Sequence, residues 1–313
     1  MATQQLGVAG LSVEARTTYE KMLQDRNTPE FVHDRFGLQK NIPANGGNNI
    51  SIRQFTRPAA SLTALVEGTP PSATNPTVGQ TIISVAQYGA YMLGSDVVDT
   101  QAIDPQLAEW TQVFTELKND TRDRVIRNGI AAGTTVNYTN GATVRSGIGS
   151  GSAYNLSWAD IRAARRSLRT NDVPYWADNR YFGIIHPDVS RNLFADTTVV
   201  NAGQYAANRG SDNPLFTGTL PDLMGIRFFE TTNATTFSGL GLSAGFVYTT
   251  LVGGKGAYAV TNYSADSDAI IYHGTGSAGA LDPLNQFWSL GFKTALGAGI
   301  IDQTRMVRIE SNG

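Results

Sequence analysis

Residues 58–95 read PAASLTALVEGTPPSATNPTVGQTIISVAQYGAYMLGS, and in these 38 residues Glu67 is the only charged side chain. Apolar and polar side chains alternate on both sides of a cluster rich in Gly, Pro and Asn, which favours two strands joined by a turn. The predicted limbs run from Ile50 to Val66 and from Val78 to Leu93. At about 3.3 Å per residue, each limb could extend on the order of 50 Å.

A charge-poor arm of this length would be an aggregation hazard on a monomer. It makes sense if another subunit covers it, so we interpret it as an assembly arm with Glu67 near its tip. The apolar side chains that we expect a neighbouring subunit to bury are Leu62, Leu65, Val66, Ile82, Ile83 and Val85.

The composition fits an assembling protein but does not require one. Only 16% of the 313 residues are charged, against roughly 25% in ordinary soluble proteins. Depletion of charge is typical of surfaces that end in protein contacts, and a charge-poor secreted β-protein would look similar. The 19 Arg against 5 Lys also suit interfaces, although genomic base composition could produce the same bias.

Charge and cysteine content exclude several classes of protein. The net charge of −2 argues against a dedicated nucleic-acid binder, and the absence of cysteine excludes disulfides and thiolate metal sites. The N-terminal residues do not resemble a signal peptide, and no apolar run approaches the length of a membrane span. We therefore expect a soluble protein, made in a reducing cytoplasm and without a membrane partner.

The clearest helix signal runs from Asp104 to Gly129. Asp104 is a good N-cap, Pro105 occupies the permitted first position, and Gly129 is expected to mark the end. About 25 residues at 1.5 Å each give a helix of roughly 37 Å. Its predicted apolar stripe consists of Leu107, Trp110, Phe114, Leu117, Thr121 and Val125.

The second half of this helix is rich in charge. Its basic residues include Lys118, Arg122, Arg124 and Arg127. A solvated face with ion pairs between residues i and i+4 is the favoured interpretation. If the face lines a container of nucleic acid, these side chains could meet phosphate non-specifically.

The remaining chain mixes helices and strands without regular alternation, which predicts an α+β fold. Near the N-terminus we expect a helix from Val13 to Phe36, interrupted at residues 27–29. Residues 138–156 read as a loop or junction, and Ser157 resembles a capping box before an Arg-rich helix to Thr170. The predicted strands are Tyr181–Ile185, Ile226–Glu230, Phe246–Val252, Ala257–Val260 and Arg305–Ile309.

No chemical motif points to an enzyme, a metal site, a cofactor or a small-molecule ligand. The His186-Pro187-Asp188 sequence sits where a strand meets a helix, so a turn is favoured over a catalytic pair. The glycines of residues 147–151 lack the strand that a nucleophile elbow or dinucleotide site needs. Asp266 and Asp268 lack the rest of a calcium loop and read as surface carboxylates.

Several segments, from about residue 45 to residue 310, resemble in their order and spacing the N-four-type major capsid protein family of tailed bacteriophages. These segments are Glu67-Gly68-Thr69-Pro70, Tyr88-Gly89 to Ser95-Asp96, Asp104-Pro105, His186-Pro187-Asp188, Gly225 to Glu230, Ala257-Tyr258, Asp282-Pro283-Leu284, Gly291-Phe292-Lys293 and Met306 to Ile309.

The resemblance implies the Hong-Kong-ninety-seven-type capsid fold, which encapsulins and herpesvirus capsid floors share. The domains that it implies are an N-terminal arm (1–47), an E-loop (48–96), a peripheral domain with a spine helix (97–151), an axial domain (152–262) and a final segment (263–313) that returns to the peripheral domain. The spine-helix residues would be Asp104, Trp110, Phe114 and Leu117.

The function that the resemblance implies is self-assembly, in the bacterial cytoplasm, into the icosahedral head shell of a virion. The partners would be other copies in hexamers and pentamers, portal, scaffolding and decoration proteins, and packaged double-stranded DNA. In the best-known member of the fold, a Lys on the E-loop forms a cross-link. Here the nearest are Lys40 and Lys118, so we expect no covalent cross-link. Residues 1–47 leave no room for a long fused scaffolding domain before the E-loop, so we expect any scaffolding protein to be a separate chain.

Two alternative functions stay open at this point. An encapsulin-like compartment would share the fold but enclose an enzyme instead of a genome. A β-rich surface adhesin would belong to another class and would need an export signal.

Overall fold

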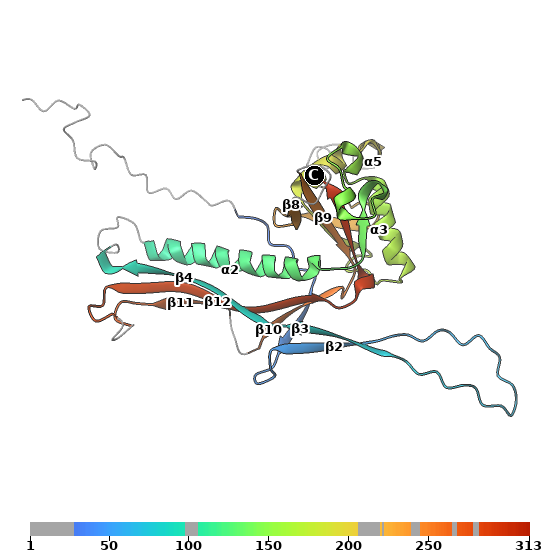
Figure 1. Cartoon of the computed structure of the whole chain (residues 1–313), viewed down its shortest axis with the longest axis horizontal. Coiled ribbons are helices and arrows are strands. Elements are labelled where there is room, and N and C mark those ends of the chain that lie inside the picture. Colours follow the sequence, from blue (N-terminus) through green and yellow to red (C-terminus); the bar gives the residue numbers. More distant parts are fainter. Residues whose placement is uncertain are drawn as a thin grey trace, which may run out of the picture.

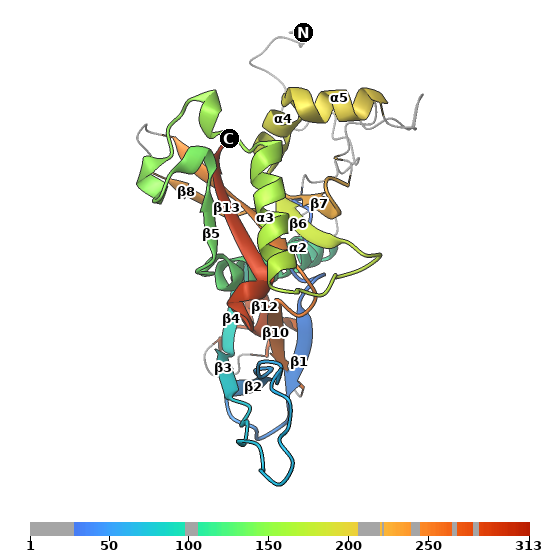
Figure 2. The same cartoon turned by 90° about the vertical axis from the view of Figure 1, so that its right-hand side faces the viewer.

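The computed structural model describes residues 28–97, 106–205, 220, 222–238, 245–264, 268–277 and 282–313. It confirms the α+β class: a body with two sheets carries a long helix on one side and a thin arm that projects away from it (Figure 1). The arm and helix α3 face the same side of the molecule (Figure 2).

The first sheet is organised by one long strand, β12 (Phe287–Ile300), which pairs along its whole length. Its first half lies between β4 and β11, and its second half pairs with β10. The strands around it are β1 (Leu38–Ile42), β4 (Ala86–Ser95), β10 (Tyr258–Tyr263) and β11 (Ala269–His273).

The second sheet forms the other half of the body, with strand order β5-β13-β9-β6-β7 and β8 attached to β9. Its strands are β5 (Val136–Tyr138), β6 (Tyr181–Ile185), β7 (Ile226–Glu230), β8 (Thr236–Ser238), β9 (Phe246–Gly253) and β13 (Met306–Asn312). The helices of this half are α3 (Trp158–Thr170), α4 (Pro187–Phe194) and α5 (Thr197–Tyr205).

The predicted starts of α3 and α4 are confirmed. Ser157 and Asp160 form a reciprocal capping box at α3. His186 caps α4, because its Nδ1 accepts a hydrogen bond of 3.1 Å from the backbone N–H of Asp188. The predicted strands of this half are also found, each within two or three residues of its predicted ends.

The arm differs from the prediction in two ways. Its ladder is short: β2 (Asn49–Phe55) pairs with β3 (Val78–Ser84), and no strand occurs in residues 56–77. A continuous first limb to Val66 is therefore wrong. The second limb is extended as predicted, but its later part, β4, leaves the arm and pairs with β12 in the body. Alternation predicts a strand but not which strand it pairs with.

The predicted N-terminal helix is wrong where it can be compared. Residues 28–37 run without helix as turns and bends that lead into β1, and residues 13–27 lie outside the described residues. Phe36 is buried against the rings of Phe182, Trp176 and Phe229, and it stacks on Phe182 at 4.6 Å between ring centroids. This packing, rather than helix propensity, determines the path of the segment.

The long helix is α2 (Gln106–Ala131), and it lies along the first sheet (Figure 1). The predicted capping residues Asp104 and Pro105 fall outside the described residues. The predicted apolar stripe is wrong in part: Phe114 is buried, whereas Trp110 and Leu117 are about 40% exposed, at 39% and 41%. The other buried apolar side chains of α2 are Ile126, Ile130 and Ala131.

Gly129 lies inside α2 and does not end it. A Cβ atom at this position would lie 2.5 Å from the carbonyl oxygen of Ala298 in β12. The glycine therefore allows the helix to approach the sheet closely.

Gly129→Ala is expected to destabilise the subunit by about 1–3 kcal/mol, because the added methyl group overpacks this contact. Helix propensity alone predicts the opposite sign, a gain of about 1 kcal/mol. Urea unfolding of the unassembled subunit measures the change. Gly79→Ala is the control, because the nearest atom to its added Cβ is 3.8 Å away. A stabilised Gly129→Ala variant would contradict the close contact.

Candidate assembly surface

The distal part of the arm exposes apolar side chains that its own subunit does not cover. Every residue from Phe55 to Gln80 is exposed. Leu62, Leu65 and Val66 are 93%, 75% and 69% exposed. Contiguous exposed apolar surface of this kind is typical of a protein interaction site.

The expected neighbour-facing residues Ile83 and Val85 do not belong to this surface. They are 4% and 6% exposed and are buried in their own subunit, where Val85 packs with Ile42 and Ala295. Our expectation that another subunit buries them is wrong, because the base of the hairpin lies against β12. Ile82, on the opposite face of β3, remains exposed.

A second apolar surface lies at the far end of the body, on the face of β4, β12 and β11 that points away from α2. The α2 side of these strands holds a core of Phe114, Trp288, Leu290 and Phe292. On the other side, the registers align Ile271, Gly291 and Tyr91 in one row and His273, Ser289 and Leu93 in the next.

Small residues on the central strand make this second surface a groove. Gly291 and Ser289 form its floor between Tyr91 on one side and Ile271 on the other, and its volume is about 350 Å³. Tyr91 and Leu93 are largely exposed. Strand β11, which supplies Ile271 and His273 to the groove, lies at the end of the molecule opposite the arm (Figure 1).

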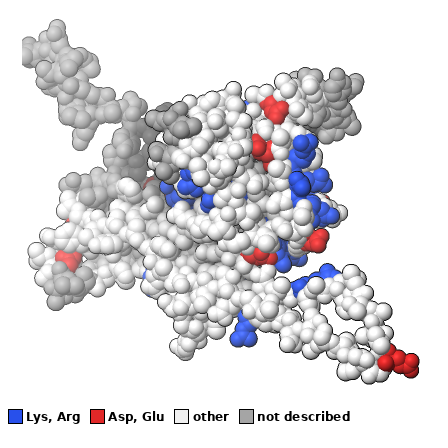
Figure 3. Space-filling view, turned by 45° about the vertical axis from the view of Figure 1, so that its right-hand side comes forward, with Lys and Arg blue, Asp and Glu red and all other residues white. Residues whose placement is uncertain are grey.

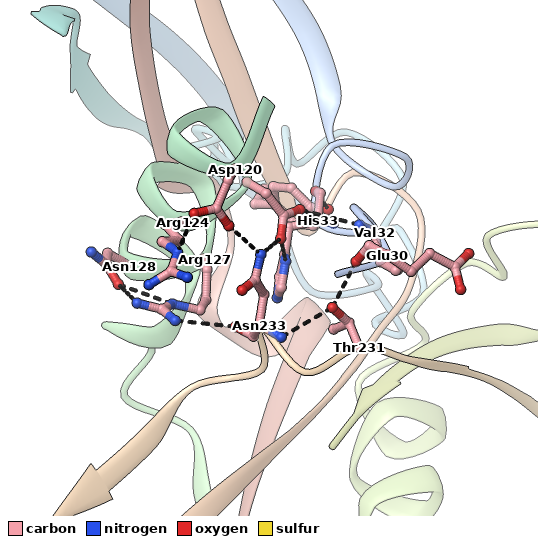
Figure 4. A network of polar contacts seen from close by, with 11 residues as sticks. Glu30, Val32, His33, Asp120, Arg124, Arg127, Asn128, Thr231 and Asn233 are labelled. Carbon is pink, nitrogen blue, oxygen red and sulfur yellow. Dashed lines mark hydrogen bonds and ion pairs between the residues drawn. The ribbon is translucent and has the colours of Figure 1, made fainter. Parts of the chain in front are cut away.

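The structure pairs three of the four basic residues of α2 that sequence reasoning offered as contacts to DNA. Arg124 forms an ion pair of 2.8 Å with Asp120, and Arg127 donates to the backbone oxygen of Asn233 (Figure 4). Arg122 forms ion pairs with Asp34 and Asp268. The predicted i,i+4 pair is thus confirmed for Arg124, and Lys118 is half-buried on the same helix.

A buried polar joint connects α2, the segment before β1 and the loop after β7 (Figure 4). The Asp123 carboxylate accepts from the backbone N–H groups of Val32 and His33 at 3.1 and 2.9 Å. It also accepts from His33 Nδ1 at 2.9 Å and from Asn233 Nδ2 at 3.2 Å. A single carboxylate therefore ties together three segments that are distant in sequence.

This joint makes the stability of the subunit depend on pH. Burial by itself raises the pKa of Asp123, but hydrogen bonds from His33 and Asn233 and the charge of His33 outweigh it, so the pKa lies below its ordinary value of 3.8. A lowered carboxyl pKa contributes stability that is present above 3.8 and is lost as the pH falls through the folded-state value.

We therefore expect the unfolding free energy of the unassembled subunit to fall below about pH 4. In Asp123→Asn this part of the pH dependence should disappear, together with some stability at neutral pH. Chemical unfolding at a series of pH values measures both effects. Asp178→Asn removes an exposed carboxylate and should keep the slope; an unchanged slope in Asp123→Asn would contradict the assignment.

A second buried network joins Arg145, in the segment after β5, to strand β13 of the second sheet. Glu310 of β13 is fully buried, and Arg145 donates to both of its carboxylate oxygens at 2.6 Å. Arg308 lies 2.9 Å from the same carboxylate. The Arg145 guanidinium also stacks 3.5 Å above the centroid of the Phe237 ring. The sequence analysis did not predict this network, because Arg145 and Glu310 are 165 residues apart and belong to no common sequence pattern.

The sequence His186-Pro187-Asp188 lies at the start of α4, where it has a structural role. His186 accepts a hydrogen bond from the backbone N–H of Asp188 at the turn into α4. The Asp188 carboxylate accepts a hydrogen bond of 2.8 Å from the Tyr248 hydroxyl. Within the described ranges no three His, Cys, Asp or Glu side chains gather in a way that could hold a metal ion. In the same ranges, no helix has the length and apolar content needed to cross a membrane.

Structures of phage capsids share this fold along almost the whole chain. The capsid of Ralstonia phage GP4 matches with a TM-score of 0.73 and 13% identity, over 100% of this chain and 98% of that chain. The cyanophage Pam1 capsid asymmetric unit matches with a TM-score of 0.73 and 15% identity, over 100% of both chains. The acidic stable capsid of Helicobacter pylori bacteriophage KHP30 matches with a TM-score of 0.71 and 12% identity, over 99% of both chains.

At these identities the structural matches show the fold alone, and they confirm the predicted Hong-Kong-ninety-seven type. No curated protein matches the sequence. A family model described as phage capsid protein matches residues 77–309, which is well over half of the chain. The chain therefore belongs to the phage capsid protein family and is a major capsid shell protein.

Proposed function

We propose that this chain assembles, without covalent cross-links, into the closed icosahedral head shell of a tailed phage and encloses double-stranded DNA. The observation that carries the proposal is the arm: residues 55–80 are all exposed, and they present Leu62, Leu65 and Val66 without cover from their own subunit. In an assembled shell, a neighbouring copy would cover them. The chain then acts as a structural protein and not as an enzyme.

The positions of the two apolar surfaces support rings of subunits. The arm and strand β11, which lines the groove beside Tyr91, lie at opposite ends of the molecule (Figure 1). A contact between two different patches on identical subunits is head-to-tail, and it closes into a ring when the rotation per subunit allows. Hexamers and pentamers are such rings.

The size of the contact suits reversible assembly. An apolar footprint of roughly 500 Å² contributes of order 12 kcal/mol at about 25 cal/mol per Å². Ordering the arm and losing rotational and translational freedom offset much of this amount. Single contacts can therefore break and re-form while the closed shell, in which every subunit makes several contacts, stays intact.

The domain roles follow the same proposal. Residues 1–47 would be an N-terminal arm, 97–151 the peripheral domain and 152–262 the axial domain around the capsomer axes, with 263–313 returning to the peripheral domain. The pairing of β4 with β12 favours ending the E-loop near Ser84 instead of at residue 96. Portal, scaffolding and decoration proteins would be the heterologous partners.

Negative-stain electron microscopy and sedimentation of the expressed chain test the proposal. Closed particles of uniform size are the expected result. Discrete monomers or trimers under all assembly conditions would contradict it. Nuclease-protected DNA in particles from infected cells would establish a genome as cargo, whereas protein cargo would indicate an encapsulin-like compartment.

A further inference from the structure

Helix α3 carries a row of arginines on its outer face. Its basic residues, within eight positions of sequence, are Arg162, Arg165, Arg166 and Arg169. Steps of four and three residues place Arg162, Arg166 and Arg169 on the same side of a helix. All three are exposed, whereas the residues of α3 that face the core are Ile161, Ala164 and Leu168.

Arg162, Arg166 and Arg169 differ from Arg122 and Arg124 of α2, which form ion pairs with carboxylates of their own subunit. In the part of the chain that the structure describes, no acidic side chain forms an ion pair with Arg162, Arg166 or Arg169. Arg169 interacts with aromatic residues of its own subunit: its guanidinium lies 5.2 Å from the centroid of the Tyr175 ring, and a hydrogen bond with Tyr181 raises its pKa. Figure 3 shows a column of basic residues on the right of the molecule, the side on which α3 lies in Figure 1 and which faces the viewer in Figure 2.

A polar hollow of about 740 Å³ adjoins this row and is lined by Arg166. Its other polar lining side chains include Asn137, Thr143, Ser167, Thr170 and Asn171. Asp160 also lines it, but its carboxylate already accepts from the Ser157 backbone N–H at 3.0 Å and from the Ser157 hydroxyl at 2.6 Å. Arginine flanked by amide and hydroxyl groups is the combination that contacts phosphate and sugar in nucleic acids.

We infer that the α3 face formed by Arg162, Arg166 and Arg169 is a non-specific contact for the phosphate backbone of nucleic acid. The inference rests on the proposed function, in which the shell encloses DNA. It assigns the DNA contact to α3 instead of to the basic residues of α2 that the sequence analysis considered. Arg162 and Arg169 are separated by about 10 Å along the helix axis. Duplex DNA carries about six phosphate charges over this length, at one per ~1.7 Å. The spacing of phosphates along a duplex therefore allows the three guanidinium groups to contact different phosphates.

The binding should be weak and strongly dependent on salt. The chain as a whole carries a net charge of −2, so attraction to DNA is confined to the local field of the arginine row. Neutralising three phosphates contributes a slope of about −2.7 to a plot of log binding constant against log salt concentration, at ~0.9 per phosphate.

The test uses unassembled full-length subunits and a fluorescently labelled duplex of about 30 base pairs, titrated at several salt concentrations between roughly 50 and 200 mM. The variant is Arg162→Gln/Arg166→Gln/Arg169→Gln. The matched control, Lys40→Gln/Arg57→Gln/Lys255→Gln, removes the same charge from exposed and dispersed positions. We expect the α3 variant to bind at least ~10-fold more weakly, with a salt slope smaller by about 2.7, and the control to change little.

Three results would overturn the inference: no DNA binding by the wild type, equal losses in variant and control, or DNA binding retained by the α3 variant. If that variant kept DNA binding but formed no shells, the row would contact another subunit or protein instead. Shell formation by the wild type, scored separately by electron microscopy, tests the proposed function on its own, so that failures of the two proposals are distinguishable.

Discussion

Subunits in which residues 57–76 are replaced by Asn-Gly are expected to fold and to form no shells. The ladder of β2 and β3 ends where the backbone N–H of Thr56 donates to the oxygen of Thr77 at 2.9 Å. A two-residue Asn-Gly turn closes such a hairpin well. All the removed residues are exposed, so the core of the subunit loses no packing. Sedimentation should show subunits only, and electron microscopy should show no particles.

Two variants that keep the full length of the arm test whether its apolar side chains are needed for assembly. Leu62→Ser/Leu65→Ser/Val66→Ser should raise the subunit concentration needed for assembly by at least ~10-fold, since each buried side chain of this size contributes about 1.5–3 kcal/mol. Thr63→Ser/Thr69→Ser/Thr74→Ser keeps the polarity of the arm and should assemble normally. Normal particles from the Asn-Gly variant would rule out the arm as the assembly contact.

Glu310→Ala is expected to cost about 3–5 kcal/mol of subunit stability, because it leaves two guanidinium groups without their shared carboxylate. Glu310 is fully buried, and Arg145 and Arg308 both lie within 3 Å of it, at 2.6 and 2.9 Å. Arg308 also donates to the backbone oxygen of Ala131 at the end of α2. The loss would therefore loosen the contact between the two halves of the body.

Urea unfolding of unassembled subunits measures this loss. Glu310→Gln keeps the shape of the side chain and should lose less unfolding free energy than Glu310→Ala. It therefore allows the stability loss to be measured if the alanine variant does not fold. Glu67→Ala removes an exposed carboxylate at the tip of the arm and should change stability by no more than about 0.5 kcal/mol. A loss below about 1 kcal/mol for Glu310→Ala would show that the ion pairs contribute little.

Local signals in the sequence were sufficient for much of the fold. The caps at Ser157 and His186 predict where α3 and α4 begin, because a cap satisfies backbone groups within the same few residues. The 26-residue helix α2 was predicted from spacing, and most strands of the second sheet from apolar runs. The order of short segments also carried the resemblance to phage capsid proteins, which the family match confirms.

Contacts between distant segments could not be predicted in this way. The joint between His33 and Asp123 spans 90 residues of sequence, and neither residue belongs to a pattern that would indicate it. The same limit explains the errors on α2, where a helical stripe ranks side chains by hydrophobicity alone. The sheet that α2 packs against decides that Phe114 is buried while Trp110 and Leu117 stay exposed.

The sequence by itself determined that residues 58–95 form a charge-poor extended segment, because charge and alternation are properties of neighbouring residues. Only the tertiary structure decided how this segment is divided. Ten residues of β4 pair with β12, so β4 belongs to the body. Ile83 and Val85 are buried at the base of the hairpin. Residues 56–77 form no ladder within the subunit and remain exposed. A strand pairs with whichever edge the rest of the chain brings beside it, and that edge is encoded far away in sequence.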